Sequence, residues 1–167
     1  MADGLALPSP EQIRGHVRSS LGSPWDRHGD ALAALPVPIV RLPPIRGVLR
    51  LVEVELPEWA RDLGVEGVLL VPAELGGAWD AVDWWTASFV LMECWHERAW
   101  EAAHGPVHAY STRLPGWDER AWERAWVNRI AAFLARWAGI PEPPGAPTMV
   151  LTHDVDALSK TVAIRLK

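Results

Sequence analysis

The residues best suited to chemistry in this sequence are two aspartates, Asp154 and Asp156, separated by a single valine. They follow the apolar run 149–151, which is typical of a strand buried on both faces of a parallel sheet. Alternate side chains of an extended chain point to the same face, so the two carboxylates would lie side by side. Charged carboxylates at close range repel each other, and a metal ion or a shared proton relieves the repulsion. The pair is therefore a candidate metal and general-base site.

The same two residues also have a purely structural interpretation. The segment 157–167 has the character of a helix, and Asp156 stands where an N-cap would. Asp154 would then be a loop carboxylate. The residue pattern alone leaves both interpretations open.

The segment 150–156, with the sequence VLTHDVD, resembles the first motif of the polysaccharide deacetylase family, the NodB-homology domain, in its Asp-x-Asp form. The resemblance implies that this motif ends the first strand of a distorted (β/α) barrel. It also implies that Asp154 is the catalytic base and Asp156 a metal ligand. The sequence has His153 where the commoner form of the motif has Phe. The segment 83–139 is similar to the region that precedes the barrel in a bacterial subgroup of deacetylase-like proteins.

The resemblance implies a metal-dependent hydrolase that removes the acetyl group from an N-acetylated carbohydrate. In that family a divalent metal, held by one Asp and two His, polarises the acetamide carbonyl and activates a water, and the other Asp takes the proton. We expect zinc, and only in a complete enzyme. A (β/α) barrel usually spans about 200 residues or more, and the other ligands of the family are not found here. We therefore expect this chain to be the N-terminal portion of such an enzyme, with little activity alone.

The tryptophan content supports an alternative from a different class. The chain has eleven tryptophans, which fall mainly in two helical segments. A non-catalytic Trp-rich α+β module that binds a partner protein or a glycan would fit, because aromatic faces suit the apolar faces of sugar rings. At helical spacing, as for Trp122, Trp126 and Trp137, packing in the core is the favoured role.

Two histidines, His104 and His108, have the spacing of a helical zinc pair, with Cys94 and His96 upstream. Gly105 and Pro106 interrupt a helix between them, so this spacing loses its geometric meaning. In the deacetylase family the His-x-x-x-His pair follows the Asp motif in the chain, whereas here it precedes it. We therefore do not transfer the metal-binding roles and expect a loop with solvated histidines.

The elements that must position these residues indicate an α+β fold. Strands are predicted over 48–56 and 67–72, with a helical turn over 58–64 between them. Two long amphipathic Trp-rich helices are predicted over 83–103, with Asp83 as N-cap, and over 118–138. The first strand and helix of a barrel that is not completed in this chain would follow.

The predicted domain organisation has four parts. Residues 1–30 form a weakly structured lead, with a short helix that Pro10 would open, and residues 31–140 form the small α+β domain. Residues 141–147 are a Pro-rich linker, and residues 148–167 are the first β-α unit of the deacetylase-like barrel.

Composition limits the cellular setting. The net charge is −5 and no basic stripe is present, which argues against nucleic-acid binding. No apolar run has the length of a signal peptide or a transmembrane helix, so we expect a cytoplasmic protein without a membrane partner. The single cysteine fits a reducing compartment. Substrate and oligomeric state are left open.

Overall fold

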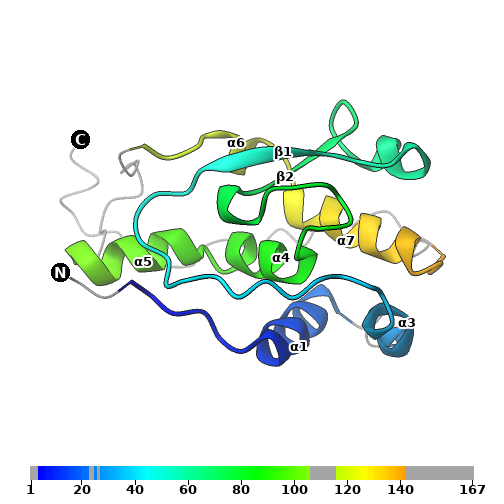
Figure 1. The fold of residues 1–167 in the computed structure, drawn as a ribbon, viewed down its shortest axis with the longest axis horizontal. Coiled ribbons are helices and arrows are strands. Elements are labelled where there is room, and N and C mark those ends of the chain that lie inside the picture. Colours follow the sequence, from blue (N-terminus) through cyan, green and yellow to red (C-terminus); the bar gives the residue numbers. More distant parts are fainter. Residues whose placement is uncertain (1–3, 23–24, 26, 106–115, 142–167) are drawn as a thin grey trace, which may run out of the picture.

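A computed structural model describes residues 4–22, 25, 27–105 and 116–141 (Figure 1). They form a mixed α+β structure with a small antiparallel sheet and several helices. The elements in chain order are α1 (Pro10–Leu21), α3 (Gly29–Ala33), β1 (Leu51–Glu55), the 3₁₀ turn η1 (Glu58–Leu63), β2 (Val68–Pro72), the 3₁₀ turn η2 (Ala73–Leu75), α4 (Trp84–Met92), α5 (Trp95–His104), α6 (Arg120–Glu123) and α7 (Trp126–Trp137). The predicted barrel unit at 148–167 lies outside the described residues.

The two predicted strands are confirmed. β1 and β2 pair antiparallel, in a register that joins Leu51 to Pro72 and Glu55 to Val68. The predicted helical turn between them is η1. β1 exposes Glu53 and Glu55 and buries Leu51 and Val54, whereas almost all of β2 is buried. The difference arises because α4 and α7 both pack against β2.

Helix α4 lies at the centre of the core, between α1 and the sheet (Figure 1). Every residue from Trp84 to Val90 is buried. A helix that is apolar all round must be covered on all sides, and α1, α7 and β2 provide that cover.

Asp83 starts α4, as predicted. It is only 2% exposed, and its Oδ1 accepts a hydrogen bond from the Thr86 backbone N–H at 3.0 Å. Its Oδ2 accepts two more, from the Thr86 hydroxyl at 2.8 Å and from the Val40 N–H at 3.0 Å. The capping residue therefore also anchors the extended segment around Val40 to the core helix.

The prediction of one continuous helix over 83–103 is wrong. α4 ends at Met92, and Cys94 has the left-handed conformation, with φ +50°, before α5 begins. Glu93 concentrates the contacts at this break: its carboxylate binds Arg98 at 2.9 Å and lies 2.7 Å from His16 Nε2 of α1. Arg98 Nε also donates to the Glu93 carbonyl at 2.9 Å. The break is thus held by one local pair, Glu93–Arg98, and one long-range contact, His16–Glu93, and the sequence has no Gly or Pro at this point that would predict it.

The second predicted helix, 118–138, is also divided. Arg124 is extended, with φ −143° and ψ 153°, between α6 and α7. The buried Trp126 turns its Nε1–H onto the Arg120 carbonyl at 2.7 Å. After this break α7 buries Trp126, Ile130 and Phe133, which confirms this part of the predicted core face. The predicted helix end near residue 138 is confirmed as well, since α7 ends at Trp137 and Gly139 follows with φ +67°.

Asp118 binds the main chain of β1 and does not start a long helix. Its Oδ2 accepts from the Leu51 N–H of β1 at 3.1 Å, and Arg120 donates to the Leu51 carbonyl at 3.0 Å. The two side chains also pair with each other at 2.8 Å. We call this pair the β1 clamp, because it satisfies both main-chain groups of Leu51 on the outer edge of the sheet.

The predicted N-terminal helix is present and longer than the short helix expected. Pro10 stands at its first turn, and Ser9 and Gln12 form a capping box. Ile13 and Val17 are buried, and α1 packs on α4. No helix in the described part of the chain is long and apolar enough to cross a membrane.

Candidate functional site

The predicted site residues Asp154 and Asp156 lie outside the described residues, as does His108. The structure therefore neither brings the two carboxylates together nor separates them. Within residues 4–22, 25, 27–105 and 116–141, no group of three or more His, Cys, Asp or Glu side chains is gathered as a metal site would require.

His104 is described, and its contacts are local. It is the last residue of α5, and the predicted helix stop at Gly105 is confirmed by a φ of +90°. Its ring stacks on Trp100 with centroids 3.9 Å apart and planes 16° apart. Its Nδ1 lies 3.0 Å from the Trp100 carbonyl. These contacts fit an exposed helix terminus.

His96 is the buried histidine of the described chain, at 1% exposed. Its Nε2 lies 3.4 Å from Glu74 Oε1, and this contact lowers the pKa of the Glu74 carboxyl. Its Nδ1 has no partner among the described residues. The His96–Glu74 pair joins α5 to the 3₁₀ turn η2.

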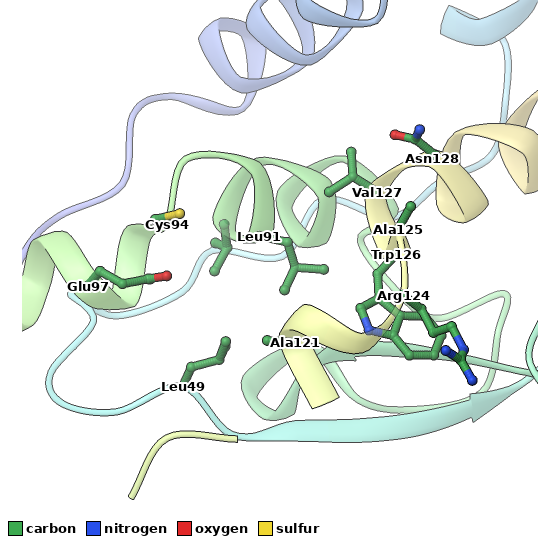
Figure 2. A pocket seen from close by; sticks show the side chains of 11 residues that line it. Leu49, Leu91, Cys94, Glu97, Ala121, Arg124, Ala125, Trp126, Val127 and Asn128 are labelled. Carbon is green, nitrogen blue, oxygen red and sulfur yellow. The ribbon is translucent and has the colours of Figure 1, made fainter. Parts of the chain in front are cut away.

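A pocket of about 170 Å³ forms where the two predicted helices break (Figure 2). Cys94 and Glu97 lie on one side of it, and Arg124 and Trp126 lie on the other. Its lining is mostly apolar and comes from the segment before β1 and from the two pairs of divided helices: Leu49, Val90, Leu91, Cys94, Glu97, Ala121, Arg124, Ala125, Trp126, Val127 and Asn128. Continuous helices would not leave this space, so the sequence analysis missed the pocket.

The polar groups of this pocket are poorly suited to catalysis. Burial raises the pKa of the Cys94 thiol to about 11, and the neighbouring Glu97 carboxylate, which accepts its hydrogen bond, adds to the rise. The nucleophilic form of cysteine is the thiolate, which is scarce at neutral pH with such a pKa. Burial also raises the pKa of Glu97. The pocket is smaller than typical ligand sites, which occupy about 300–1,000 Å³.

A second feature is an aromatic cluster at the surface, formed by Trp59 of η1, Trp79, and Phe133 and Trp137 of α7. Trp59 stacks on the fully buried Phe133, with centroids 5.5 Å apart and planes 13° apart. Trp79 meets both Trp59 and Trp137 at steep angles, at 5.9 and 5.2 Å. Trp59 is 44% exposed. The sequence analysis missed it because it stands outside the helical Trp stripes.

Comparison of the chain with models of protein families, with curated proteins and with solved structures finds no match in any of the three.

Proposed function

We propose that this chain carries the first catalytic motif of a polysaccharide deacetylase-like, metal-dependent hydrolase, preceded by the α+β module described above. The observation that carries the proposal is the sequence VLTHDVD at 150–156, in which two carboxylates at strand spacing follow a buried-type apolar run. The substrate class is an N-acetylated carbohydrate.

In this proposal the two acids have different roles. Asp154 is the general base and Asp156 is a ligand of a divalent metal, zinc by the resemblance. One carboxylate is a poor zinc site, because catalytic zinc usually has three protein ligands. The described residues do not supply the others as a group. We therefore expect little or no deacetylase activity from this chain alone.

The contacts inside the module support a structural role for its acidic residues, distinct from the catalytic role proposed for the motif. The acids best placed by the fold already serve structure: Asp83 caps α4, Glu93 holds the helix break and Asp118 forms the β1 clamp. Helix α7 ends at Trp137, and Gly139 and Pro141 follow. Asp154 and Asp156 come after this helix end in the sequence, and the proposal assigns the chemistry to them.

Calorimetric titration of zinc into the purified chain tests the metal role. We expect weak binding, with Kd above about 1 μM (roughly −8 kcal/mol), which Asp156→Ala abolishes and the matched control His104→Ala leaves unchanged. The same Kd in wild type and Asp156→Ala would refute the assignment, whereas no zinc binding by either would mean that the acids are the remnant of an unfinished site. Tighter binding that both variants abolish would make His104 a ligand and extend the proposal to an active enzyme.

The nature of the hydrolase has a separate test. If the motif belongs to a deacetylase-like barrel, the DNA downstream of the Lys167 codon should encode, in some frame, a His-x-x-x-His pair and further strand–helix units. Their absence would refute the deacetylase assignment, whatever the zinc titration shows.

A further inference from the structure

The aromatic cluster presents a flat, rigid ring to solvent. Phe133 lies against one face of the Trp59 indole. Trp59 nevertheless keeps 44% of its surface exposed, and with Phe133 against one face this exposed surface must come from the other face, the ring edges and the main chain. The Trp79 contact and the hydrogen bond from Arg136 Nη1 to the Trp59 carbonyl, at 3.4 Å, fix the residue further. A ligand that stacks on this ring therefore loses little conformational entropy to ordering it.

Charged side chains lie on the same turn as Trp59. Asp62 lies three residues further along η1, with its side chain 67% exposed, and it pairs with Arg136 of α7. Glu58 and Arg61 form a second exposed pair on the same turn. Carboxylates accept several hydrogen bonds and guanidinium groups donate several. The rim of the exposed ring thus offers both acceptors and donors at short range.

The exposed area of Trp59 suits a single sugar ring better than a protein interface. Trp59 and Ile39 are the only large apolar residues that the described chain exposes strongly. The exposed part of Trp59 amounts to roughly 100 Å², given that a tryptophan buries about 150–250 Å². A stable protein interface buries about 800 Å² on each partner, of which roughly 450 Å² is apolar, and the exposed part of Trp59 supplies only a small share of that apolar area. A single pyranose ring has a matching area.

The partial charge on the indole face indicates which ligand would stack on it. The face of an indole carries partial negative charge, which attracts C–H groups of partial positive charge. A β-1,4-linked chain of glucose or N-acetylglucosamine, whose ring substituents are all equatorial, has axial C–H groups on its ring faces and hydroxyls around its equator. The C–H face would meet Trp59, and the hydroxyls would meet Asp62 and the neighbouring charged groups. We propose that the Trp59 face is a binding surface for β-1,4-linked oligosaccharides of glucose or N-acetylglucosamine.

This inference goes beyond the proposed function, because the surface belongs to the module and requires no metal. It gives the module a task of its own, which is to hold a glycan chain. Trp137, at the end of α7, belongs to the same cluster, and the Pro-rich segment 141–147 and the Asp-x-Asp motif follow it in the chain. A glycan held here would be tethered to the motif by that short stretch.

The test measures binding of two probes to the full chain in EDTA: the pentamer of β-1,4-linked N-acetylglucosamine and the pentamer of β-1,4-linked glucose. Titration calorimetry gives the affinity, and saturation-transfer NMR shows which sugar protons touch the protein. We expect Kd on the order of 0.1–10 mM, as for a small contact, with the strongest saturation on the axial ring protons. Binding of both probes supports ring stacking, and Trp59-dependent binding of the acetylated probe alone supports stacking with an additional acetamide contact.

The variants decide the assignment. Trp59→Ala should weaken binding at least about tenfold, and Trp59→Phe, which keeps an aromatic face, should weaken it less. Asp62→Ala, at an exposed position, should weaken sugar binding about threefold. This variant still tests the proposal if Trp59→Ala unfolds the protein. Trp100→Ala is the matched control, because Trp100 also stacks on a neighbouring ring but lies on α5, and it should bind as wild type does.

Several results would overturn the proposal: binding of neither probe, equal affinity of wild type and Trp59→Ala, or saturation confined to the acetyl methyl group. A dimer in sedimentation velocity that Trp59→Ala dissociates, without sugar binding, would show a self-association surface instead. Asp156→Ala should bind sugar as wild type does. This result keeps a failure of the metal proposal separate from a failure of this one.

Discussion

Replacement of Asp83 by alanine should be among the most destabilising single changes in the module. The carboxylate is buried and accepts three hydrogen bonds, two from Thr86 and one from the Val40 N–H. Alanine removes every acceptor at once and leaves the donors without a replacement nearby. The start of the central helix and its connection to the extended segment at Val40 are lost together.

The magnitude follows from two contributions. Loss of an N-cap costs about 1 kcal/mol, within a range of about 0.5–2. A buried donor left unsatisfied costs about 1–3 kcal/mol, and the Val40 N–H is such a donor. We therefore expect Asp83→Ala to lower the free energy of unfolding by about 3 kcal/mol. Asp83→Ser should lose less, since the hydroxyl can cap Thr86 but is too short to reach Val40 as well.

Urea unfolding followed by tryptophan fluorescence measures the effect, because the buried Trp84 and Trp85 adjoin Asp83. With a slope of about 1.5 kcal/mol per molar urea, the midpoint should fall by about 2 M. Asp80→Ala, at an exposed position nearby, is the matched control and should change stability by less than about 0.5 kcal/mol. A loss below about 1 kcal/mol in Asp83→Ala would refute the assigned role.

Two further predictions concern titration. Alkylation of Cys94 by iodoacetamide should accelerate about tenfold per pH unit until about pH 11, where the thiol titrates. Glu97→Gln should lower the pKa of Cys94, because it removes a neighbouring negative charge. An alkylation rate that levels off below pH 9 would contradict the raised pKa. Hydrogen bonds from Arg120 lower the pKa of Asp118, so the β1 clamp stabilises the fold above the unfolded pKa of about 3.9 and is lost as pH falls through the lower folded value. Urea titrations between pH 5 and 2 should show a shallower acid loss in Asp118→Asn, and identical pH profiles would exclude this contribution.

Local patterns in the sequence predict much of the fold. The alternation before Glu55, the apolar run that ends at Pro72 and the capping position of Asp83 each specify an element, because the signal and the structure involve the same neighbouring residues. The helix breaks at Cys94 and Arg124 have no such local signal. They depend on contacts between residues far apart in the chain, such as His16 with Glu93.

The candidate sites also depend on contacts that local patterns in the sequence do not predict. The pocket beside Cys94 exists only because of the two helix breaks, so its residues could not be grouped from spacing. Trp59 has no distinguishing neighbours in the sequence, and its position is set by the stack on Phe133, which is distant in the chain. The Asp154–Asp156 prediction rests on the motif alone.

The β1 clamp has a consequence for how the protein behaves at high concentration. A strand at the border of a small sheet presents unpaired main-chain groups that another molecule can use as a template for aggregation. At Leu51 the chain occupies that position itself, with a carboxylate in place of the next strand's carbonyl and a guanidinium in place of its amide. A second molecule must displace this charge-assisted pair before it can add a strand there. Protonation of Asp118 weakens the pair, so acid should expose a template for intermolecular assembly before the core itself unfolds.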